Sequence, residues 1–345
     1  MSILEKALSH SKKIGIDECE IVTVEKKTTT VRITDSEIVE IKQNFDKKYG
    51  IRIIHQKKIV SIQTTDSQNI EKDIDNIFET ISNFKPREFW KGLPYKVSAR
   101  KIEGTFDDRL EEISGKNSMD IAQSMINSAD NEKINTITGS LNIVSEDFQL
   151  RNSQGLEFDD KATYVSGIIN AESEQGNIPV SGIGHASGRT LSNFSKEQIG
   201  EDAKIMCIES INPQKIESDT YPIIFEPYSV GELLAFVVAS NFNFKTFTEK
   251  KSCFSNKLKE EIGIKEFNLI DDPYAPEGIG TKSVDDEGVE TQKKYLVEKG
   301  VFKNTFSNLF DSYKEGEQST GNASRPGSPM GRSSEPIPVS SPHNL

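Results

Sequence analysis

Five short segments within the first 63 residues alternate apolar and polar side chains, and they decide the expected fold. They are residues 20–25 (EIVTVE), 30–34 (TVRIT), 38–42 (IVEIK), 50–54 (GIRII) and 59–63 (IVSIQ). Because successive side chains on a strand point to opposite faces, this period of two predicts short antiparallel strands joined in a meander. Polar residues at 46–48 (DKK) and 56–58 (QKK) are expected to form turns.

Apolar residues at helical spacing lie on both sides of this meander. Ile3, Leu4, Ala7 and Leu8 predict a helix over residues 3–16. Residues 67–83 repeat Ile and Phe at positions i, i+4, i+7 and i+8, which predicts a second helix, with Asp66 or Ser67 as its N-cap. The pattern indicates an N-terminal α+β domain over residues 1–96 with the order helix, antiparallel meander, helix.

The middle of the chain, residues 97–216, reads as a second, mixed α+β domain. A helical stripe at 121–129 precedes expected strands at 135–138, 141–144, 148–150 and 162–171, with a turn at 152–155 (NSQG). The glycine-rich residues 176–188 are expected to form a loop. Ser195 begins an S-x-x-Q capping box, and Cys207 on the helix that follows is expected to be a buried core thiol.

Residues 217–345 are expected to form a β-rich C-terminal domain. Strands are predicted at 222–225 and 267–270, a helix at 231–240, and a hairpin from 295–297 and 301–304 with Gly300 in its turn. The last 29 residues hold seven Ser, five Pro and three Gly and show no apolar period, so they form either a disordered tail or a long ordered loop. The fold class that follows for the whole chain is α+β.

Composition excludes several classes of protein. The 345 residues include 42 Lys and Arg against 54 Asp and Glu, a net charge of −12, which argues against a nucleic-acid partner. No apolar run approaches the roughly 18 residues that span a membrane, and no export signal opens the chain, so a cytoplasmic protein is expected. The three Cys form no CxxC pair and the four His are scattered, which disfavours disulfides and an HExxH zinc site.

Three polar clusters could carry chemistry, and each also has a structural interpretation. The acids at 271–272 and 285–287 do not match a calcium loop, so turn formation is the favoured interpretation. Residues 319–323 (STGNA) fit a structural or substrate-lining loop better than a nucleophile, since no base lies nearby. Residues 182–188 (GIGHASG) lack the ending of a phosphate-binding loop, and His185 alone is a weak ligand candidate.

The C-terminal third resembles the TldD/PmbA family, formerly described as modulators of DNA gyrase. The resemblance rests on an ordered series of motifs: YPIIFEP (221–227), GELL (231–234), DDP (271–273), Gly278, DDEG (285–288), LVEKGVF (296–302) and STGNA (319–323). The meander around Gly50-Ile51-Arg52 is similar to the first domain of that family. The resemblance implies that two family loops of this chain line a peptide chamber. The residues of these loops are Asp285, Asp286, Gly288, Ser319, Gly321 and Asn322.

The family contains two kinds of subunit, and the resemblance assigns this chain to one of them. TldD-like members carry an HExxxH zinc motif on the helix that follows the YPIIFEP-like strand. In this chain the three motif positions fall on Ala235, Phe236 and Ser240, none of which is a zinc ligand or a base. The chain is therefore identified as similar to the PmbA/TldE-type subunit, with no catalytic or metal-binding residues of its own.

This assignment implies a non-catalytic subunit of a cytosolic zinc metalloprotease. A TldD-like partner would supply zinc and hydrolysis, and the substrates would be unfolded or short peptides. Two alternatives remain open at this stage: a self-sufficient peptidase with an unrecognised site, and a regulatory protein-binding module of a gyrase or antitoxin pathway. Family members continue beyond the equivalents of Asn344 and Leu345, so the C-terminal domain is expected to be incomplete at its end.

Overall fold

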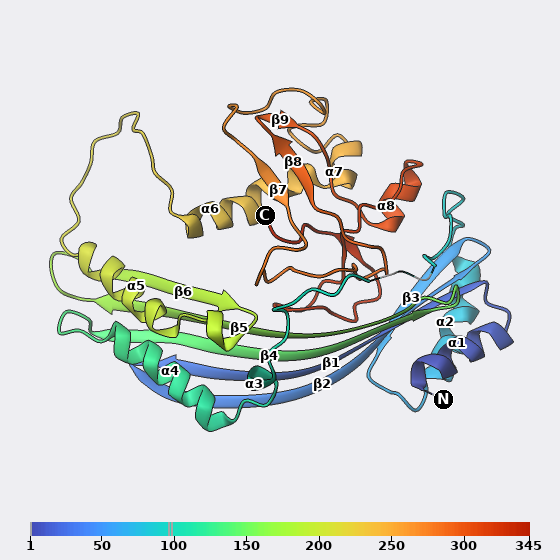
Figure 1. The fold of residues 1–345 in the computed structure, drawn as a ribbon, viewed down its shortest axis with the longest axis horizontal. Helices are drawn as coiled ribbons and strands as arrows, with labels where there is room; N and C mark the ends of the chain where they lie inside the picture. The colour runs from blue at the N-terminus through green and yellow to red at the C-terminus, as the bar shows by residue number, and fades with distance from the viewer. Residues whose placement is uncertain (1, 96, 98) are drawn as a thin grey trace.

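A computed structural model describes residues 2–95, 97 and 99–345, and its central element is a six-stranded antiparallel sheet (Figure 1). The strand order is β3-β2-β1-β4-β5-β6. The strands are β1 (Glu18–Thr34), β2 (Glu37–His55), β3 (Lys58–Thr64), β4 (Thr136–Asn152), β5 (Glu157–Ser173) and β6 (Val180–Gly188). Together with the helices described below, this sheet confirms the predicted α+β class.

The strands are longer than the sequence pattern predicted. Four of the expected short strands merge in pairs into β1 and β2, and the three strands expected between residues 135 and 150 merge into β4. The turn predicted at 46–48 was wrong: Lys47 pairs with Glu25 across the two strands and its ammonium lies 2.7 Å from that carboxylate. Cross-strand charge pairs and β-branched residues such as Thr29 keep the polar middle extended. The turn at 56–58 is confirmed, because Gln56 and Lys57 have φ of 50° and 60°.

Helices cover one face of the sheet at both of its ends. α1 (Ile3–Lys13) and α2 (Ile70–Thr80) cover one end, and α4 (Gly115–Ala129) and α5 (Lys196–Glu209) the other, with the short α3 (Asp108–Glu111) beside them. Odd-numbered residues of the long strands face these helices: Ile21 packs with α1 and α2, and Val31 and Leu141 pack with α4. Cys207 is buried in this core, as predicted.

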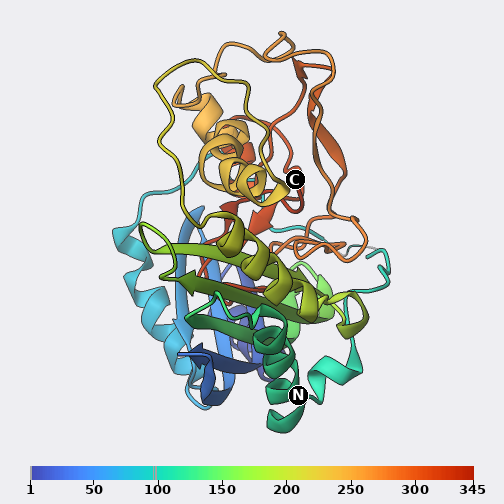
Figure 2. The ribbon, with the colours of Figure 1, turned by 90° about the vertical axis from the view of Figure 1, so that its left-hand side faces the viewer.

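The chain after residue 218 lies on the opposite face of the sheet (Figure 2). Even-numbered residues face it: Val22 and Phe148 form one apolar cluster with Val284. This part consists of short elements joined by long irregular segments: α6 (Pro227–Leu233), the π-helical turn η3 (Leu234–Val238), the 3-10 turn η4 (Ala239–Phe242), α7 (Phe244–Thr248), β7 (Leu269–Asp271), β8 (Lys294–Glu298), β9 (Val301–Phe302), α8 (Leu309–Lys314), β10 (Ala323–Ser324) and β11 (Val339–Ser340). The predicted helix near 231–240 and the hairpin around Gly300 are confirmed.

Four local predictions were wrong. Residues 180–188 form β6 rather than a loop, because their small side chains pack beneath α5. Ser195 precedes α5 but its side chain accepts no capping hydrogen bond, and Asn69, not Asp66 or Ser67, stands at the N-cap of α2. Residues 222–225 form no strand, and Ile224 in that segment is 98% exposed.

The predicted domain boundary at 96/97 falls between strands of one sheet. β3 ends before this boundary and β4 begins after it. The pairing of β1 with β4 joins the predicted N-terminal domain and the predicted middle domain in one sheet. The divisions at 1–96, 97–216 and 217–345 stay predictions. Within the described residues, no helix combines the length and the apolar content that a bilayer crossing needs.

Candidate functional site

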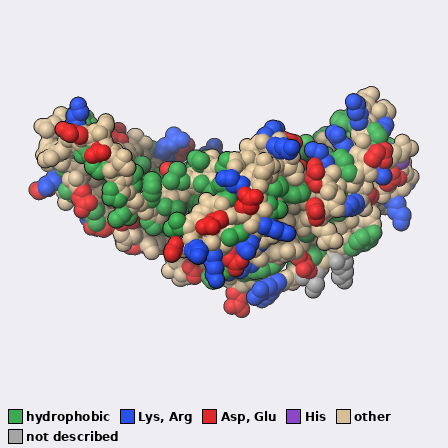
Figure 3. All heavy atoms as spheres, turned by 90° about the horizontal axis from the view of Figure 1, so that it is seen from above, with side chains coloured by type: hydrophobic (Ala, Val, Ile, Leu, Met, Phe, Trp, Pro, Cys, Tyr) green, Lys and Arg blue, Asp and Glu red, His purple; other side chains and the backbone are tan. Residues whose placement is uncertain are grey.

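The three zinc-motif positions lie on the exposed helical segment formed by α6, η3 and η4, which we call the α6–η4 helix. Ala235 and Phe236 belong to η3 and Ser240 to η4, and the Phe236 side chain is 82% exposed. The Ser240 hydroxyl donates to the Val237 carbonyl 3.4 Å away. Seen from above, hydrophobic side chains gather on the surface in this region (Figure 3). The helix therefore presents apolar groups where a metal-binding helix would present imidazoles.

A hollow beside this helix contains one imidazole and one carboxylate. It is lined by His185 of β6, Tyr228, Glu232 and Ala235 and measures about 560 Å³. The rings of His185 and Tyr228 meet edge to face with centroids 4.4 Å apart. Catalytic zinc needs three protein ligands in its first shell, and within the described residues no three His, Cys, Asp or Glu side chains come together in that way. The residues here do not fit a zinc ion.

The adjacent acids Asp285 and Asp286 point to different partners in the interior. Asp285 accepts main-chain hydrogen bonds from Glu287, Val289 and Ala323, each 2.9 Å long, and among the described residues it forms no ion pair. Burial, followed by the nearby Glu287 carboxylate, raises the pKa of Asp285 to about 7. Asp285 therefore ties the 285–289 turn to β10.

Asp286 lies between two cations and is fully paired. Its Oδ1 accepts from Lys282 at 3.0 Å and from Arg332, and its Oδ2 accepts from the Arg325 main chain at 2.8 Å. Burial opposes ionisation, but Lys282 and Arg332 outweigh it and hold the pKa of Asp286 well below its usual range. This carboxylate has no free oxygen for acid–base work.

Ion pairs continue from Asp286 to the strands of the sheet. Arg325 donates to Glu20 on β1, and Glu20 also accepts from Arg52 on β2 at 3.0 Å. The other arm of Arg52 reaches Glu287 at 2.7 Å, and the second Glu287 oxygen accepts from the Leu309 main chain. We call this cluster of alternating charges the charged junction; its members are Glu20, Arg52, Asp286, Glu287, Arg325 and Arg332.

The charged junction fastens the C-terminal segment to the sheet. All of its side chains are nearly inaccessible to water, at 6% exposed or less. Arg332 also donates to Asp160 on β5 at 2.8 Å and stacks over the Phe148 ring at 4.5 Å. Buried charges are tolerated only when each has a partner, and here each of these groups has one. The cluster is built to hold the protein together and offers no free nucleophile or base.

The STGNA loop is fixed by a second buried network. The Asn322 amide donates to Asp271 at 2.7 Å, and its oxygen accepts from Lys294 at 2.7 Å. Asp271 also accepts the main-chain N–H of His343 at 2.7 Å. The His343 ring is hydrogen-bonded to the Gly321 carbonyl at 2.8 Å, and burial lowers the pKa of this imidazole to about 4. The loop is thereby joined to β7, β8 and the last residues of the chain.

The remaining predicted loop residues have structural contacts of the same kind. Ser319 donates to the Ser307 carbonyl at 3.2 Å. Gly321 and Gly288 have φ of 70° and 86°, the left-handed region that favours glycine. A Cβ at Gly321 would overlap the Glu290 carbonyl, and one at Gly288 would press on Leu156. Both positions therefore require glycine for backbone geometry and close packing.

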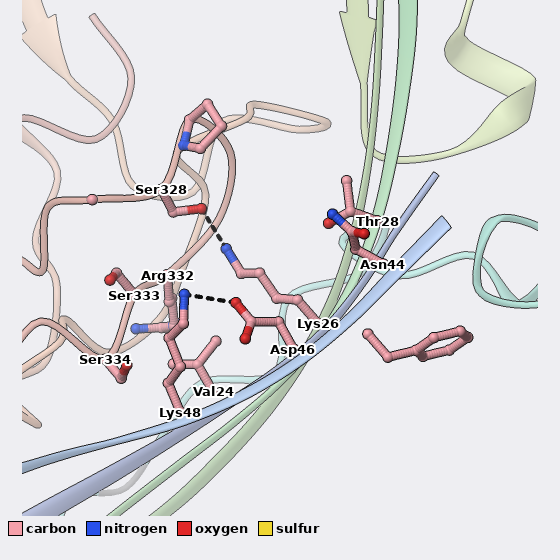
Figure 4. Close-up of a pocket in the computed structure, with 13 residues that line it drawn as sticks. Val24, Lys26, Thr28, Asn44, Asp46, Lys48, Ser328, Arg332, Ser333 and Ser334 are labelled. Carbon is pink, nitrogen blue, oxygen red and sulfur yellow. Dashed lines mark hydrogen bonds and ion pairs between the residues drawn. The ribbon is translucent and has the colours of Figure 1, made fainter. Parts of the chain in front are cut away.

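A polar pocket opens where residues 327–334 cross β1 and β2 (Figure 4). It measures about 500 Å³, and its lining includes Lys26, Lys48 and Arg332. Each of these cations is already neutralised: Lys26 by Glu146 at 3.1 Å and Lys48 by Asp46 at 2.7 Å, while Arg332 belongs to the charged junction. Lys26 also donates to Ser328 at 2.6 Å. The pocket therefore has no spare positive charge for an anion.

Comparison with known proteins places these features in one family. Residues 19–83 match the model of PmbA/TldA metallopeptidase domain 1, and residues 218–345 match the PmbA/TldA metallopeptidase C-terminal domain. The chain belongs to the PmbA/TldD family. The two matches fall on the meander and on the C-terminal motifs from which the resemblance was inferred.

Individual proteins resemble this chain over most of its length. The chain is 25% identical over 325 residues to the protein MJ0231 of Methanocaldococcus jannaschii, covering 93% of this chain and 74% of that one. It is 23% identical to a metalloprotease PmbA homolog of Buchnera aphidicola over 86% of this chain and 68% of that protein. The crystal structure of TldE from Thermococcus kodakarensis superposes with a TM-score of 0.88 at 22% identity, covering 99% and 76% of the two chains, which shows a shared fold.

Within this family fold, the predicted loop residues and the zinc-motif positions differ in burial and in their contacts. Asp285, Asp286 and Asn322 are buried and bonded within the chain, and Asp285 and Asn322 both hold the 319–324 region. Their role in lining a peptide chamber stays a prediction. The structure brings them together with partners on the strands, whereas Ala235, Phe236 and Ser240 lie apart on the α6–η4 helix.

Sequence reasoning missed the basic half of the charged junction. Arg325 and Arg332 lie in the Ser/Pro/Gly-rich segment that was expected to be either a disordered tail or a long ordered loop, and each is less than 5% exposed. Glu20 and Arg52 belong to strands that alternate apolar and polar residues, and neither of them was singled out from the sequence. One signal was present: both stand at even positions in otherwise apolar strands, on the face that also carries Val22 and Ile54.

Proposed function

We propose that this chain is the TldE-type, non-catalytic subunit of a TldD/TldE-type zinc metalloprotease that acts on unfolded or short peptides. Family membership makes the chain metallopeptidase-like, and curated relatives are named metalloproteases. The observation that carries the finer assignment is the occupancy of the motif positions by Ala235, Phe236 and Ser240. None of these side chains binds zinc or takes a proton from water at neutral pH.

The chemistry of the buried acids supports the same proposal. A zinc peptidase needs ligands and a general base that can reach the substrate. Asp286 and Glu287 are held by arginines or main-chain N–H groups, and Asp285 is enclosed by three main-chain donors. Zinc and hydrolysis therefore belong to a TldD-like partner, while this chain contributes structure and peptide contacts.

The test is reconstitution with a zinc-loaded TldD-like protein from the same source. The isolated chain should leave an unfolded casein substrate intact, and the mixture should cleave it in a reaction that a chelator abolishes. Ser240→Ala in this chain should leave the rate unchanged, whereas His→Ala at the matching position of the partner should abolish it. Chelator-sensitive cleavage by the isolated chain would overturn the proposal.

A further inference from the structure

A further cavity lies at the end of the sheet, between β2, β3 and the short helices α7 and α8. Its lining combines charged and apolar residues, among them Arg87, Lys245, Phe310, Asp311, Ile337 and Val339, and it measures about 490 Å³. This size is within the range of small-ligand sites. The cavity shares only Arg52 with the charged junction and is separate from the hollow beside the α6–η4 helix.

Positive charge at this cavity is only partly balanced: Asp311 of the lining and Glu249 attract Lys245, but neither forms an ion pair with it among the described residues. Among the described residues, neither Arg87 nor Lys245 has a carboxylate within ion-pair distance. Arg52 at the cavity wall uses its two terminal nitrogens for Glu20 and Glu287, and its Nε, although buried, has no hydrogen-bond partner among the described residues. Asp311 is the one acid of the lining, and its Oδ2 accepts from the Ser340 hydroxyl at 3.2 Å.

The pocket of Figure 4 differs from this cavity in its charge balance. There, Lys26 and Lys48 each have a carboxylate within 3.1 Å. Here, Arg87 and Lys245 form no ion pair within the described part of the chain, although the net charge of the whole sequence is −12. An anion that reaches Arg87 and Lys245 gains two charge-assisted contacts without displacing an existing partner.

The rest of the cavity is apolar and offers main-chain groups. Ile337 and Val339 are 62% and 44% exposed, and the Arg87 guanidinium lies over the Phe310 ring at 5.8 Å. Ile337 lies between Pro336 and Pro338, in a bend that precedes β11, and its main-chain N–H and C=O have no partner among the described residues. A ligand with its own extended amide backbone could pair with these groups.

We propose that this cavity binds the C-terminal carboxylate of a peptide whose last side chains are apolar. The carboxylate would contact Arg87 and Lys245, the terminal side chain would pack on Phe310 and Ile337, and the peptide backbone would run beside Ile337. The choice of a peptide over another apolar carboxylate rests on the proposed function, whereas the charge and the apolar lining do not depend on it.

The experiment measures binding of a fluorescein-labelled Ala-Ala-Leu peptide to the isolated chain by fluorescence anisotropy. The free acid should bind at least about tenfold more tightly than its C-terminal amide, and added salt should weaken it. Arg87→Gln and Lys245→Gln should each weaken the free acid by about fivefold or more. Lys250→Gln, an exposed lysine just beyond α7 and outside the cavity, is the matched control and should change nothing.

Three results would overturn the proposal. The first is equal affinity for the free acid and the amide. The second is a loss of affinity in the Lys250→Gln variant as large as in the Arg87→Gln and Lys245→Gln variants. The third is no binding of the free acid up to about 1 mM. Octanoate, a fatty acid with the same terminal group, is tested as a competitor; binding of octanoate without the peptide would overturn the peptide assignment. Mass spectrometry of the same samples reports any cleavage, so failure of the proposed function is seen separately from failure of this site.

Discussion

The charged junction and the α6–η4 helix reverse the usual distribution of polar and apolar side chains. The arginine and carboxylate side chains of the charged junction are at most 6% exposed, whereas Phe236 and Val237 on the helix are 82% and 58% exposed. The DDEG motif belongs to the first region and the zinc-motif positions belong to the second. Family motifs in this chain thus maintain the fold at the charged junction, whereas Phe236 and Val237 lie on the exposed face of a helix whose other face, with Leu234, Val238 and Phe242, packs in an apolar cluster.

The largest effect should come from opening the charged junction. Arg332→Ala leaves Asp286 and Asp160 without their shared cation and should lower the free energy of unfolding by about 3–5 kcal/mol, measured by urea denaturation. Arg32→Ala is the matched control, because its side chain is 66% exposed and its ion pair with Glu40 is 3.9 Å long. If the two variants are equally stable, the junction does not hold the two parts together. Arg332→Lys, which keeps the charge, should recover part of the loss.

A second effect concerns the close approach of the C-terminal segment to the sheet. A Cβ at Gly50 of β2 would overlap the Ser334 carbonyl oxygen, so Gly50→Ala must displace that segment. We expect a loss of about 1–3 kcal/mol and faster proteolysis between residues 326 and 341.

Gly115→Ala provides the comparison for this change. Gly115 opens α4 and has open space where its Cβ would lie, so the substitution should be neutral or slightly stabilising. Equal unfolding midpoints and unchanged proteolysis for the two variants would show that contact between β2 and residue 334 is dispensable.

A third prediction uses the pH dependence of Asp285. Its pKa is raised from 3.8 to about 7, mainly by burial. Between about pH 4 and 7 the native chain holds a proton that the unfolded chain has released, so this group makes stability fall as pH rises, by at most about 1.4 kcal/mol per pH unit. Asp285→Asn should remove that slope in chemical denaturation series at several pH values.

His343 titrates in the same pH range as Asp285. The pH dependence of stability is therefore compared between the native chain and the Asp285→Asn variant. Burial lowers the pKa of His343 to about 4, so the unfolded chain binds the extra proton below pH 6.5 and stability rises with pH across that window. The two contributions oppose each other in the native sequence. With Asp285 replaced, the rise due to His343 should remain; identical slopes in both proteins would contradict the Asp285 assignment.

These two regions also show what the sequence could and could not predict. The period of two identified the meander, and the order of short motifs identified the family, because both signals are local. The length of β1 and β2 was missed, since Lys47 and its neighbours read as a turn until their cross-strand partners are known. Arg325 and Arg332 were missed because their burial depends on Glu20 and Asp160, which lie 305 and 172 residues away in the chain.

The smallest effect on stability should come from the exposed face of the α6–η4 helix. Phe236→Ser removes an aromatic ring that is already 82% exposed, so little apolar burial is lost and the free energy of unfolding should change by less than about 0.5 kcal/mol. Phe242→Ser, only two turns further along, removes a ring that is 1% exposed and packs against Phe302 at 5.2 Å, and should cost about 3 kcal/mol or more. Urea denaturation of the two variants tests whether the exposed face of the helix contributes to the stability of the fold. A large loss in the Phe236 variant would mean that this side chain supports the fold, and the contrast with the charged junction would then fail.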